Sequence, residues 1–266
     1  GGLPVPVPLV EEAGYDLDLD ALQAAVGPRT RLIILNSPGN PTGGVHPPET
    51  LARVAELALR HDLWVLSDEI YARLVYGDPG HSGQDEARVP TIAALPGMAE
   101  RTIIADGFSK TYAMTGWRLG FGLMPASLAE KMDLLLTHSV GCTATFTQYA
   151  GLEAVLGPQD EVDRVVAEYR RRRDLMVEGL NAIPGVRCPV PRGAFYAFPN
   201  VAAFGRPSAE LADLLLAEAG VALLPGTAFG RNGEGYLRLT YANSVENIQR
   251  ALAHMAATLP SLAAMP

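Results

Sequence analysis

Cysteines, lysines and long hydrophobic runs are scarce in this chain. Its two cysteines, Cys142 and Cys188, form no CxxC pair. This excludes a disulfide framework and a cysteine-based metal site, and it fits a reducing, cytoplasmic setting. No apolar run is long enough to cross a membrane. The net charge of −8 argues against binding to the phosphate backbone of nucleic acids.

The remaining composition is that of a compact globular protein. With 266 residues, of which 48% are hydrophobic and 19% charged, we expect one large domain or two modest ones. The one dense basic run covers residues 170–173. It lies in a segment with helical spacing of apolar residues, so we interpret it as a solvated helix face rather than a binding patch.

Short apolar runs alternate with amphipathic stretches in the first half of the chain, a pattern typical of α/β architecture. It predicts buried strands at residues 31–35, 63–66, 102–105 and 119–123. Helices are predicted at residues 50–60 and around the apolar stripe of Leu128, Met132, Leu135 and Leu136.

The pattern changes near Gly157, which predicts an α+β second domain over residues 158–266 after a first domain over residues 1–157. A long helix is expected at residues 160–182, followed by strands at 194–198, 221–224 and 236–240 and by helices at 208–219 and 244–259.

Ligands in open α/β sheets bind beyond the carboxyl ends of the strands. Three segments follow predicted strands in this way, at residues 36–43, 67–71 and 106–110. The sequence therefore places the chemistry in these segments.

Lys110 is the first candidate for that chemistry. The chain has 21 basic residues, but only Lys110 and Lys131 offer a primary amine that can lose its proton and form an imine. Lys131 flanks an apolar helix stripe, where a surface lysine is the ordinary interpretation. Taken alone, Lys110 would also be interpreted as an ordinary loop residue. The residues around it favour a nucleophilic lysine instead.

Asp68 and Tyr71 follow a predicted strand three residues apart. Asp68 either caps a following helix or faces a ligand, for example a pyridine nitrogen that it would keep protonated. At close range and an effective dielectric constant near 20, that attraction is about 4 kcal/mol. Tyr71 either belongs to the core or reaches the same ring from the same helical face.

Three further residues have both a binding and a structural interpretation. Arg118, with the hydroxyl of Ser109 nearby, suits a phosphate dianion, and a structural ion pair would be favoured only if Lys110 were absent. Arg238 lies in a strand between apolar residues, where its partner is either a substrate carboxylate or a buried acid. Asn40 lies in a rigid turn-rich loop and could donate to a phenolic oxygen or a carboxylate.

Six segments, taken in order, resemble markers of the class I/II aminotransferases, pyridoxal-phosphate-dependent enzymes of fold type I. They are NSPGNPTG (36–43), SDEIY (67–71), SKTYAMTGWR (109–118), PRGAFY (191–196), LPGTAFG (224–230) and LRL (237–239). Each is weak alone, but their conjunction is specific. The prokaryotic aspartate aminotransferase-like subgroup also carries AMTGWR after the lysine.

The resemblance implies a large domain with a mostly parallel sheet, here incomplete, and a smaller α+β C-terminal domain. It implies that Lys110 forms the aldimine with pyridoxal 5'-phosphate and shuttles the substrate proton. It further implies that Asp68 pairs with the pyridinium, that Tyr71 and Asn40 bind the phenolic oxygen, that Ser109 and Arg118 bind the phosphate, and that Arg238 and Asn40 bind the substrate carboxylate.

The chain also departs from the family pattern. Gly107 occupies a position where many members place a phosphate-binding hydroxyl, so a backbone N–H is expected to substitute. The resemblance begins at Gly1, although the family's chain starts well before that point, so we expect part of a longer protein that is a homodimer when full length.

The implied activity is transfer of an amino group between an L-amino acid and a 2-oxo acid, with these small molecules as partners and no metal, nucleic acid or membrane. Two alternatives stay open at this point. One is a C–S lyase or decarboxylase with the same cofactor, and the other is an inactive fragment or regulatory module.

Overall fold

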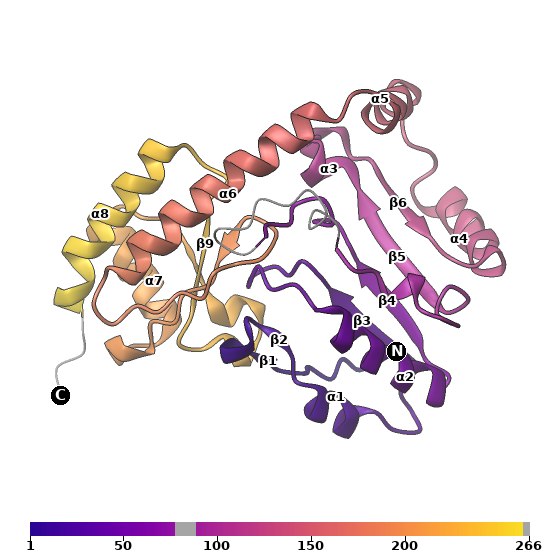
Figure 1. Cartoon of the computed structure of the whole chain (residues 1–266), viewed down its shortest axis with the longest axis horizontal. Coiled ribbons are helices and arrows are strands. Elements are labelled where there is room, and N and C mark those ends of the chain that lie inside the picture. Colours follow the sequence, from indigo (N-terminus) through magenta and orange to yellow (C-terminus); the bar gives the residue numbers. More distant parts are fainter. Residues whose placement is uncertain (78–88, 263–266) are drawn as a thin grey trace. The chain divides into compact units, whose positions relative to one another are not determined.

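The computed structural model describes residues 1–77 and 89–262 (Figure 1). The chain divides into two compact units. The first comprises residues 1–10, 16–38 and 45–164, and the second comprises residues 11–15, 39–44 and 165–266. The described residues contain no helix that is both long and apolar enough to cross a membrane.

A four-stranded sheet forms the centre of the first unit, as Figure 1 shows. Its strands are β3 (Leu32–Asn36), β4 (Trp64–Asp68), β5 (Thr102–Gly107) and β6 (Gly120–Leu123), in that spatial order. The first three run parallel and β6 is antiparallel to β5. This confirms the predicted mostly parallel sheet.

One face of this sheet is packed against helix α2 (Pro48–Arg60). Because side chains alternate along a strand, Ile33 and Leu35 of β3 and Val65 of β4 point to this face. They form a core with the apolar stripe of α2, in which Val54 and Ala58 are fully buried. Each large side chain buried in this way contributes about 1.5–3 kcal/mol. The short helix α1 (Leu19–Ala25) adds Leu22 and is capped by Asp18, which accepts from Ala21 N–H at 2.9 Å.

The opposite face is open, which contradicts the prediction that all four strands are buried. Leu32 and Ile34 of β3 are 43% and 66% exposed, and every residue of β6 is exposed. The physical reason is that β6 is an edge strand and that α2 covers only one face. Helix α4 (Ala126–Ser139) keeps the predicted helical spacing but buries none of its residues, and its apolar side chains are largely exposed, as are several on α5 (Thr145–Leu156).

Shorter elements complete the first unit and its connections. Strands β1 (Leu9–Val10) and β2 (Asp16–Leu17) form an antiparallel pair, and α3 (Phe108–Thr111) follows β5 directly. Single 3-10 turns are found in the first unit at Ile92–Ala94 and Thr115–Trp117, and in the second unit at Glu11–Ala13, Ala202–Phe204, Gly226–Phe229 and Arg231–Gly233.

The second unit is built on a three-stranded antiparallel sheet. Its strands are β7 (Tyr196–Ala197), β8 (Leu224–Pro225) and β9 (Leu237–Thr240), in the order β7-β9-β8. Helices α7 (Ser208–Ala219) and α8 (Val245–Leu262) pack together and bury leucine, isoleucine and methionine side chains. The α+β character predicted for this part of the chain is confirmed.

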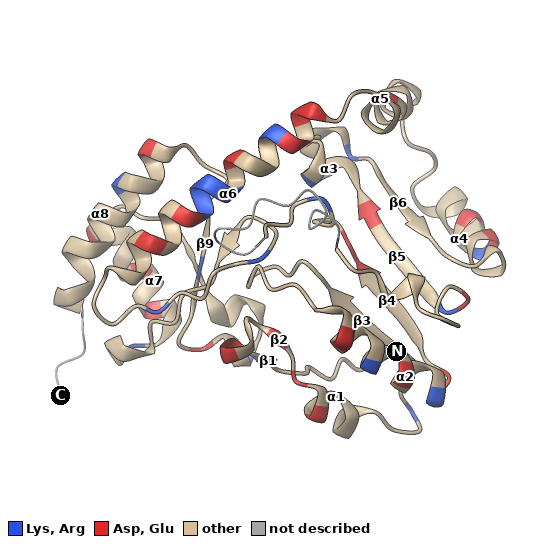
Figure 2. Ribbon diagram, in the orientation of Figure 1, with Lys and Arg blue, Asp and Glu red and all other residues tan. Residues whose placement is uncertain are grey.

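Helix α6 (Asp160–Asn181) carries charges of both signs interspersed along its length, as Figure 2 shows. The prediction of a solvated basic face fits Arg171, which pairs with Glu168 at 2.8 Å. It is wrong for Arg173, whose exposed fraction is 0%. Arg173 is buried because its guanidinium has partners there, Asp174 at 2.7 Å and the carbonyl oxygen of Pro191 at 3.1 Å.

Candidate active site

The carboxyl ends of β3, β4 and β5 meet at one edge of the sheet in the first unit. The register pairs Asn36 with Asp68 and Asp68 with Ala105, so the last residues of these strands lie side by side. Asp68 is the last residue of β4, and the segments that follow β4 and β5 carry Tyr71 and Lys110. This edge is where an open parallel sheet offers a binding site.

Lys110 and Tyr71 lie together at this edge. The Lys110 Nζ atom is 5.9 Å from the centroid of the Tyr71 ring, the distance of a cation–π contact. Tyr71 is only 3% exposed, whereas Lys110 is partly exposed on α3. Lys131 is exposed on α4, in agreement with its surface interpretation. An aromatic wall beside a partly covered amine is an environment in which a lysine can act as a nucleophile.

Asp68 ends β4 and begins a turn rather than a helix. Its Oδ1 atom accepts from the Ile70 N–H at 3.2 Å, and the Ala72 N–H donates to the Glu69 carbonyl at 2.7 Å. The expectation that Asp68 and Tyr71 share a helical face is therefore wrong. In this turn the Glu69 carboxylate accepts hydrogen bonds from the hydroxyls of Ser67 and Thr91, at 3.0 and 2.7 Å.

Asp106 is an acidic residue at this edge that the sequence analysis overlooked. Burial raises the pKa of its carboxyl to about 6, and the neighbouring charges of Glu69 and Asp68 act in the same direction. The Gly107 N–H donates to Asp106 Oδ1 at 2.6 Å and opposes the shift. The strand ends are thus rich in carboxylates, which attract a cationic group.

Gly107 donates its N–H to the side chain of Asp106. The expectation that a backbone N–H replaces the phosphate-binding hydroxyl stays a prediction. A Cβ atom at this position would lie 3.0 Å from the Leu119 carbonyl oxygen and 3.1 Å from the Cα of Gly120. The glycine is explained by the close antiparallel approach of β6 to β5.

Ser109 is half-buried on α3, next to Lys110 in the chain. Arg118 is exposed in the left-handed region (φ 53°), and its Nη1 atom donates to the Thr115 carbonyl at 2.9 Å. Within the described ranges Arg118 has no carboxylate partner, so the structural ion pair is not observed. With Trp117, Thr143 and Thr147, among others, it lines a cavity of about 550 Å³.

Asn40 and Arg238 are brought together in the second unit. The Arg238 Nη1 atom donates to Asn40 Oδ1 at 3.0 Å. The Arg238 guanidinium lies 4.7 Å from the Tyr196 ring centroid and 4.9 Å from that of Phe229. No carboxylate pairs with Arg238 among the residues that the structure describes, so the buried-acid interpretation fails. Two rings and an amide orient this guanidinium without neutralising it.

Tyr196 and Phe229 were not predicted to flank Arg238. The signal was available, since Tyr196 ends the segment 191–196 and Phe229 lies in the segment 224–230, both singled out above without a role. Sequence spacing alone does not show that β7 and the turn after β8 flank β9, because the order β7-β9-β8 is a long-range property.

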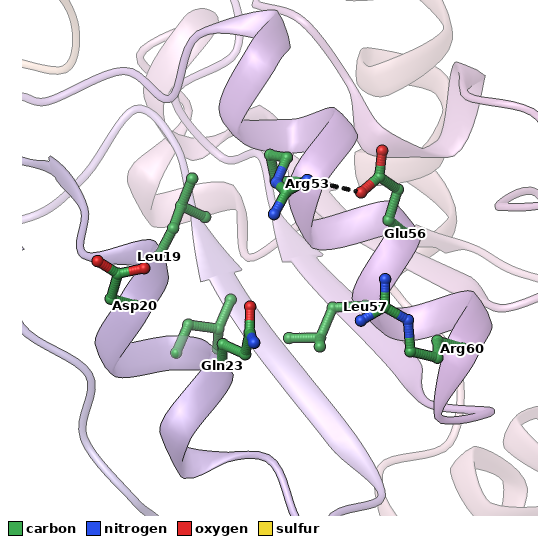
Figure 3. A pocket seen from close by; sticks show the side chains of 8 residues that line it. Leu19, Asp20, Gln23, Arg53, Glu56, Leu57 and Arg60 are labelled. Carbon is green, nitrogen blue, oxygen red and sulfur yellow. Dashed lines mark hydrogen bonds and ion pairs between the residues drawn. The ribbon is translucent and has the colours of Figure 1, made fainter.

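A second cavity lies between α1 and α2 (Figure 3). It measures about 160 Å³, and its walls include Asp20, Gln23 and an ion pair of Arg53 with Glu56 at 3.0 Å. These are exposed surface charges on helices away from the strand ends, so we assign no chemistry to it. In the described part of the chain no cluster of three or more His, Cys, Asp or Glu side chains could hold a metal ion.

Comparisons with known proteins place this arrangement in a family. The family model for aminotransferase class I and II matches residues 1–255. The chain therefore belongs to the class I and II aminotransferase family, and the resemblance inferred from the motifs is confirmed.

Three similar proteins indicate how close the relationship is. The chain is 44% identical over 255 residues to the putative aminotransferase YugH of Bacillus subtilis and 43% identical over 257 residues to the aspartate aminotransferase of Pyrococcus abyssi. Both matches cover 96% of this chain but 64% of the relative. The crystal structure of an aromatic aminotransferase from Pyrococcus horikoshii matches with a TM-score of 0.93 and 42% identity, over 98% of this chain and 68% of that one.

The fold-type prediction is confirmed by these likenesses. The chain spans about two thirds of the length of the relatives that it matches. Relatives named for aspartate and for aromatic amino acids are equally similar to it, so its likeness to them does not distinguish a substrate.

Proposed function

We propose that the full-length protein is a pyridoxal-phosphate-dependent aminotransferase that moves an amino group between an L-amino acid and a 2-oxo acid. The observation that carries the proposal is the Lys110 Nζ atom beside the Tyr71 ring, at the sheet edge that also bears Asp68. Family membership supports the same reaction class.

The side chains of the first unit fit pyridoxal 5'-phosphate group by group. A primary amine (Lys110) suits its aldehyde, a carboxylate (Asp68) its pyridine nitrogen, a phenol (Tyr71) its phenolic oxygen, and a guanidinium with a hydroxyl (Arg118 and Ser109) its phosphate. When bound, this cofactor supplies an electron sink for a carbanion at the substrate Cα. The cofactor contact expected of Asn40 stays a prediction.

Each proposed residue then has a definite task. Lys110 Nζ would hold the cofactor covalently and would carry a proton from and back to the substrate Cα atom. The negative charge of Asp68 stabilises positive charge on the ring nitrogen. Arg238 presents two parallel N–H donors to the substrate α-carboxylate, and Asn40 adds an amide N–H.

The test is chemical trapping of the cofactor on its lysine. Full-length protein is treated with borohydride, which converts the link between cofactor and lysine into a stable amine, and the modified peptide is mapped by mass spectrometry. The pyridoxyl group is expected on Lys110, and a Lys131→Ala variant, which serves as the control, should be labelled equally. A label on Lys131, or none, would remove the proposal.

Reaction type is decided by a second assay on the same preparation. An aminotransferase consumes α-ketoglutarate with an amino acid and releases no ammonia. Release of pyruvate and ammonia from cystathionine without an oxo-acid acceptor would indicate a lyase instead. The named relatives are aminotransferases, which disfavours that outcome.

We also propose that the full-length protein is a homodimer, as the family resemblance implies. Light scattering at micromolar concentration should give twice the mass of one chain. The mass of a single chain would contradict this part of the proposal.

A further inference from the structure

The buried guanidinium of Arg173 has no task in the function proposed above. Its side chain is fully buried on α6, where an unpaired charge would be strongly unfavourable. On one side it is held by Asp174, whose Oδ1 atom accepts a hydrogen bond from Nε at 2.8 Å and lies 2.7 Å from Nη2 as an ion pair. Because a fully buried guanidinium is not in contact with water, Arg173 does not serve solubility and must have a structural role.

The other side of this guanidinium holds the backbone of a loop. The Arg173 Nη1 atom donates to the carbonyl oxygen of Pro191 at 3.1 Å. The next two residues, Arg192 and Gly193, both donate their N–H groups to the carbonyl oxygen of Gly43, each at 2.9 Å. Arg173 is therefore linked through residues 191–193 to Gly43.

Gly43 belongs to the turn that carries Asn40. This turn is closed by two backbone bonds, from Gly43 N–H to the Gly39 carbonyl at 2.8 Å and from Gly39 N–H to the Gly44 carbonyl at 2.9 Å. Asn40 lies inside the turn, and its side chain accepts from Arg238. The position of Asn40 thus follows the position of Gly43.

The contact between the loop and the turn is also sterically tight. A Cβ atom on Gly43 would lie 2.5 Å from the Pro191 Cβ atom and 3.0 Å from the Gly193 carbonyl oxygen, and Gly43 has a φ of +68°. The same loop ends at Tyr196, whose ring lies against Arg238. Residues 191–193 therefore contact the turn that carries Asn40, and Tyr196 contacts Arg238.

We propose that Arg173 is a positioning residue for the carboxylate-binding pair Asn40 and Arg238. It fixes the carbonyl of Pro191, the following two amides fix Gly43, and the turn holds Asn40 at hydrogen-bond distance from Arg238. This inference rests on the proposed function, because it takes Arg238 as the carboxylate-binding group. In this proposal, residues 191–196 support substrate binding by positioning Asn40 and Arg238, and they do not contact the substrate themselves.

The main experiment compares Arg173→Met with Arg171→Met in the full-length protein. Arg171 lies two residues away on α6, is exposed and pairs with Glu168, so its variant controls for loss of a helix charge. For Arg173→Met we expect KM for the amino donor to rise about tenfold or more while kcat changes by less than about threefold, since uniform binding is lost. Amide exchange of the peptide containing Arg192 and Gly193 should also accelerate.

A second pair of variants tests the same link from the other side. Gly43→Ala and Gly220→Ala introduce a side chain at similar φ angles, +68° and +64°, but Gly220 has no atom within 4 Å of the new Cβ. Only Gly43→Ala is expected to raise KM. This pair, with Arg173→Lys, keeps the inference testable if Arg173→Met does not fold.

Defined outcomes would overturn the inference. They are an unchanged KM in a folded Arg173 variant, faster exchange without a change in KM, or equal effects of Arg171→Met. Failure of the proposed function is distinguishable, because it would show as missing transaminase activity and no pyridoxyl label on Lys110 in the unsubstituted protein.

Discussion

The two units of the chain contribute groups of different kinds to the proposed reaction. The first offers an amine, a phenol and carboxylates at the ends of parallel strands, and these are groups that gain or lose protons. The second offers a guanidinium held by two rings and an amide, a group suited to binding a carboxylate. The proposal therefore gives proton transfer to the sheet edge of the first unit, and substrate recognition to Arg238 on β9 and Asn40 in its turn.

Substitution of Lys110 should have the largest effect. Lys110→Ala removes the only amine at the strand ends, so we expect loss of the yellow absorbance of the bound cofactor and loss of turnover by at least about 10³-fold. Absorbance spectra and transaminase rates of the full-length protein would measure both. Activity that survives in Lys110→Ala but not in Lys131→Ala would reverse the assignment.

Asp68→Ala should come next. Loss of an attraction of about 4 kcal/mol corresponds to about a thousandfold in rate, while part of the cofactor should stay bound through its other contacts. The measurement is kcat together with cofactor content after gel filtration. A fully active Asp68→Ala protein would contradict the electron-sink argument.

Arg238→Met tests whether the second unit binds the substrate carboxylate. Removal of a charge-assisted hydrogen bond of about 1.5–3 kcal/mol predicts a rise in KM of about 10- to 100-fold, with cofactor absorbance unchanged. Arg231→Met, on the exposed turn that precedes β9, is the matched control. If Arg238→Met lost its cofactor colour instead, the division of labour between the two units would be wrong.

The smallest effect concerns Asp106 and depends on pH. Its folded-state pKa of about 6 lies above the ordinary value of 3.8, so the folded protein binds this proton more tightly than the unfolded chain. The contribution is favourable below pH 4 and is lost as the pH rises through about 6. Thermal unfolding should therefore show that Asp106→Asn raises Tm more at pH 8 than at pH 5. Asp133→Asn, which changes an exposed residue of α4, is the control and should show no such trend.

Much of the architecture could be predicted from the sequence because local patterns determine it. Alternation and helical spacing placed β3, β4, β5 and the helices α2, α6 and α7 within about two residues. The strand ends then indicated Lys110, Asp68 and Tyr71, and the structure brings Lys110 and Tyr71 together. The domain boundary near residue 157 and the roles of the individual site residues stay predictions.

Features that depend on distant partners could not be predicted in this way. Arg173 was assigned to a solvated face because its partner Pro191 lies 18 residues ahead and contacts it only in the folded state. The prediction that residues 119–123 are buried was wrong, because the periodicity of a strand does not show whether other elements cover its faces. In the turn after Asp68, the Glu69 carboxylate accepts a hydrogen bond from Thr91, a residue of another segment.

The open sheet has a practical consequence for handling the protein. Strands β3 and β6 are the two edges of the sheet, and neither contains a proline or a charged residue to discourage pairing with a neighbouring chain. Exposed Ile34 and Leu123 add apolar surface beside those edges. A recombinant product limited to these 266 residues should therefore form edge-to-edge aggregates as its concentration rises, and a lysine in place of Ile34 should delay their appearance.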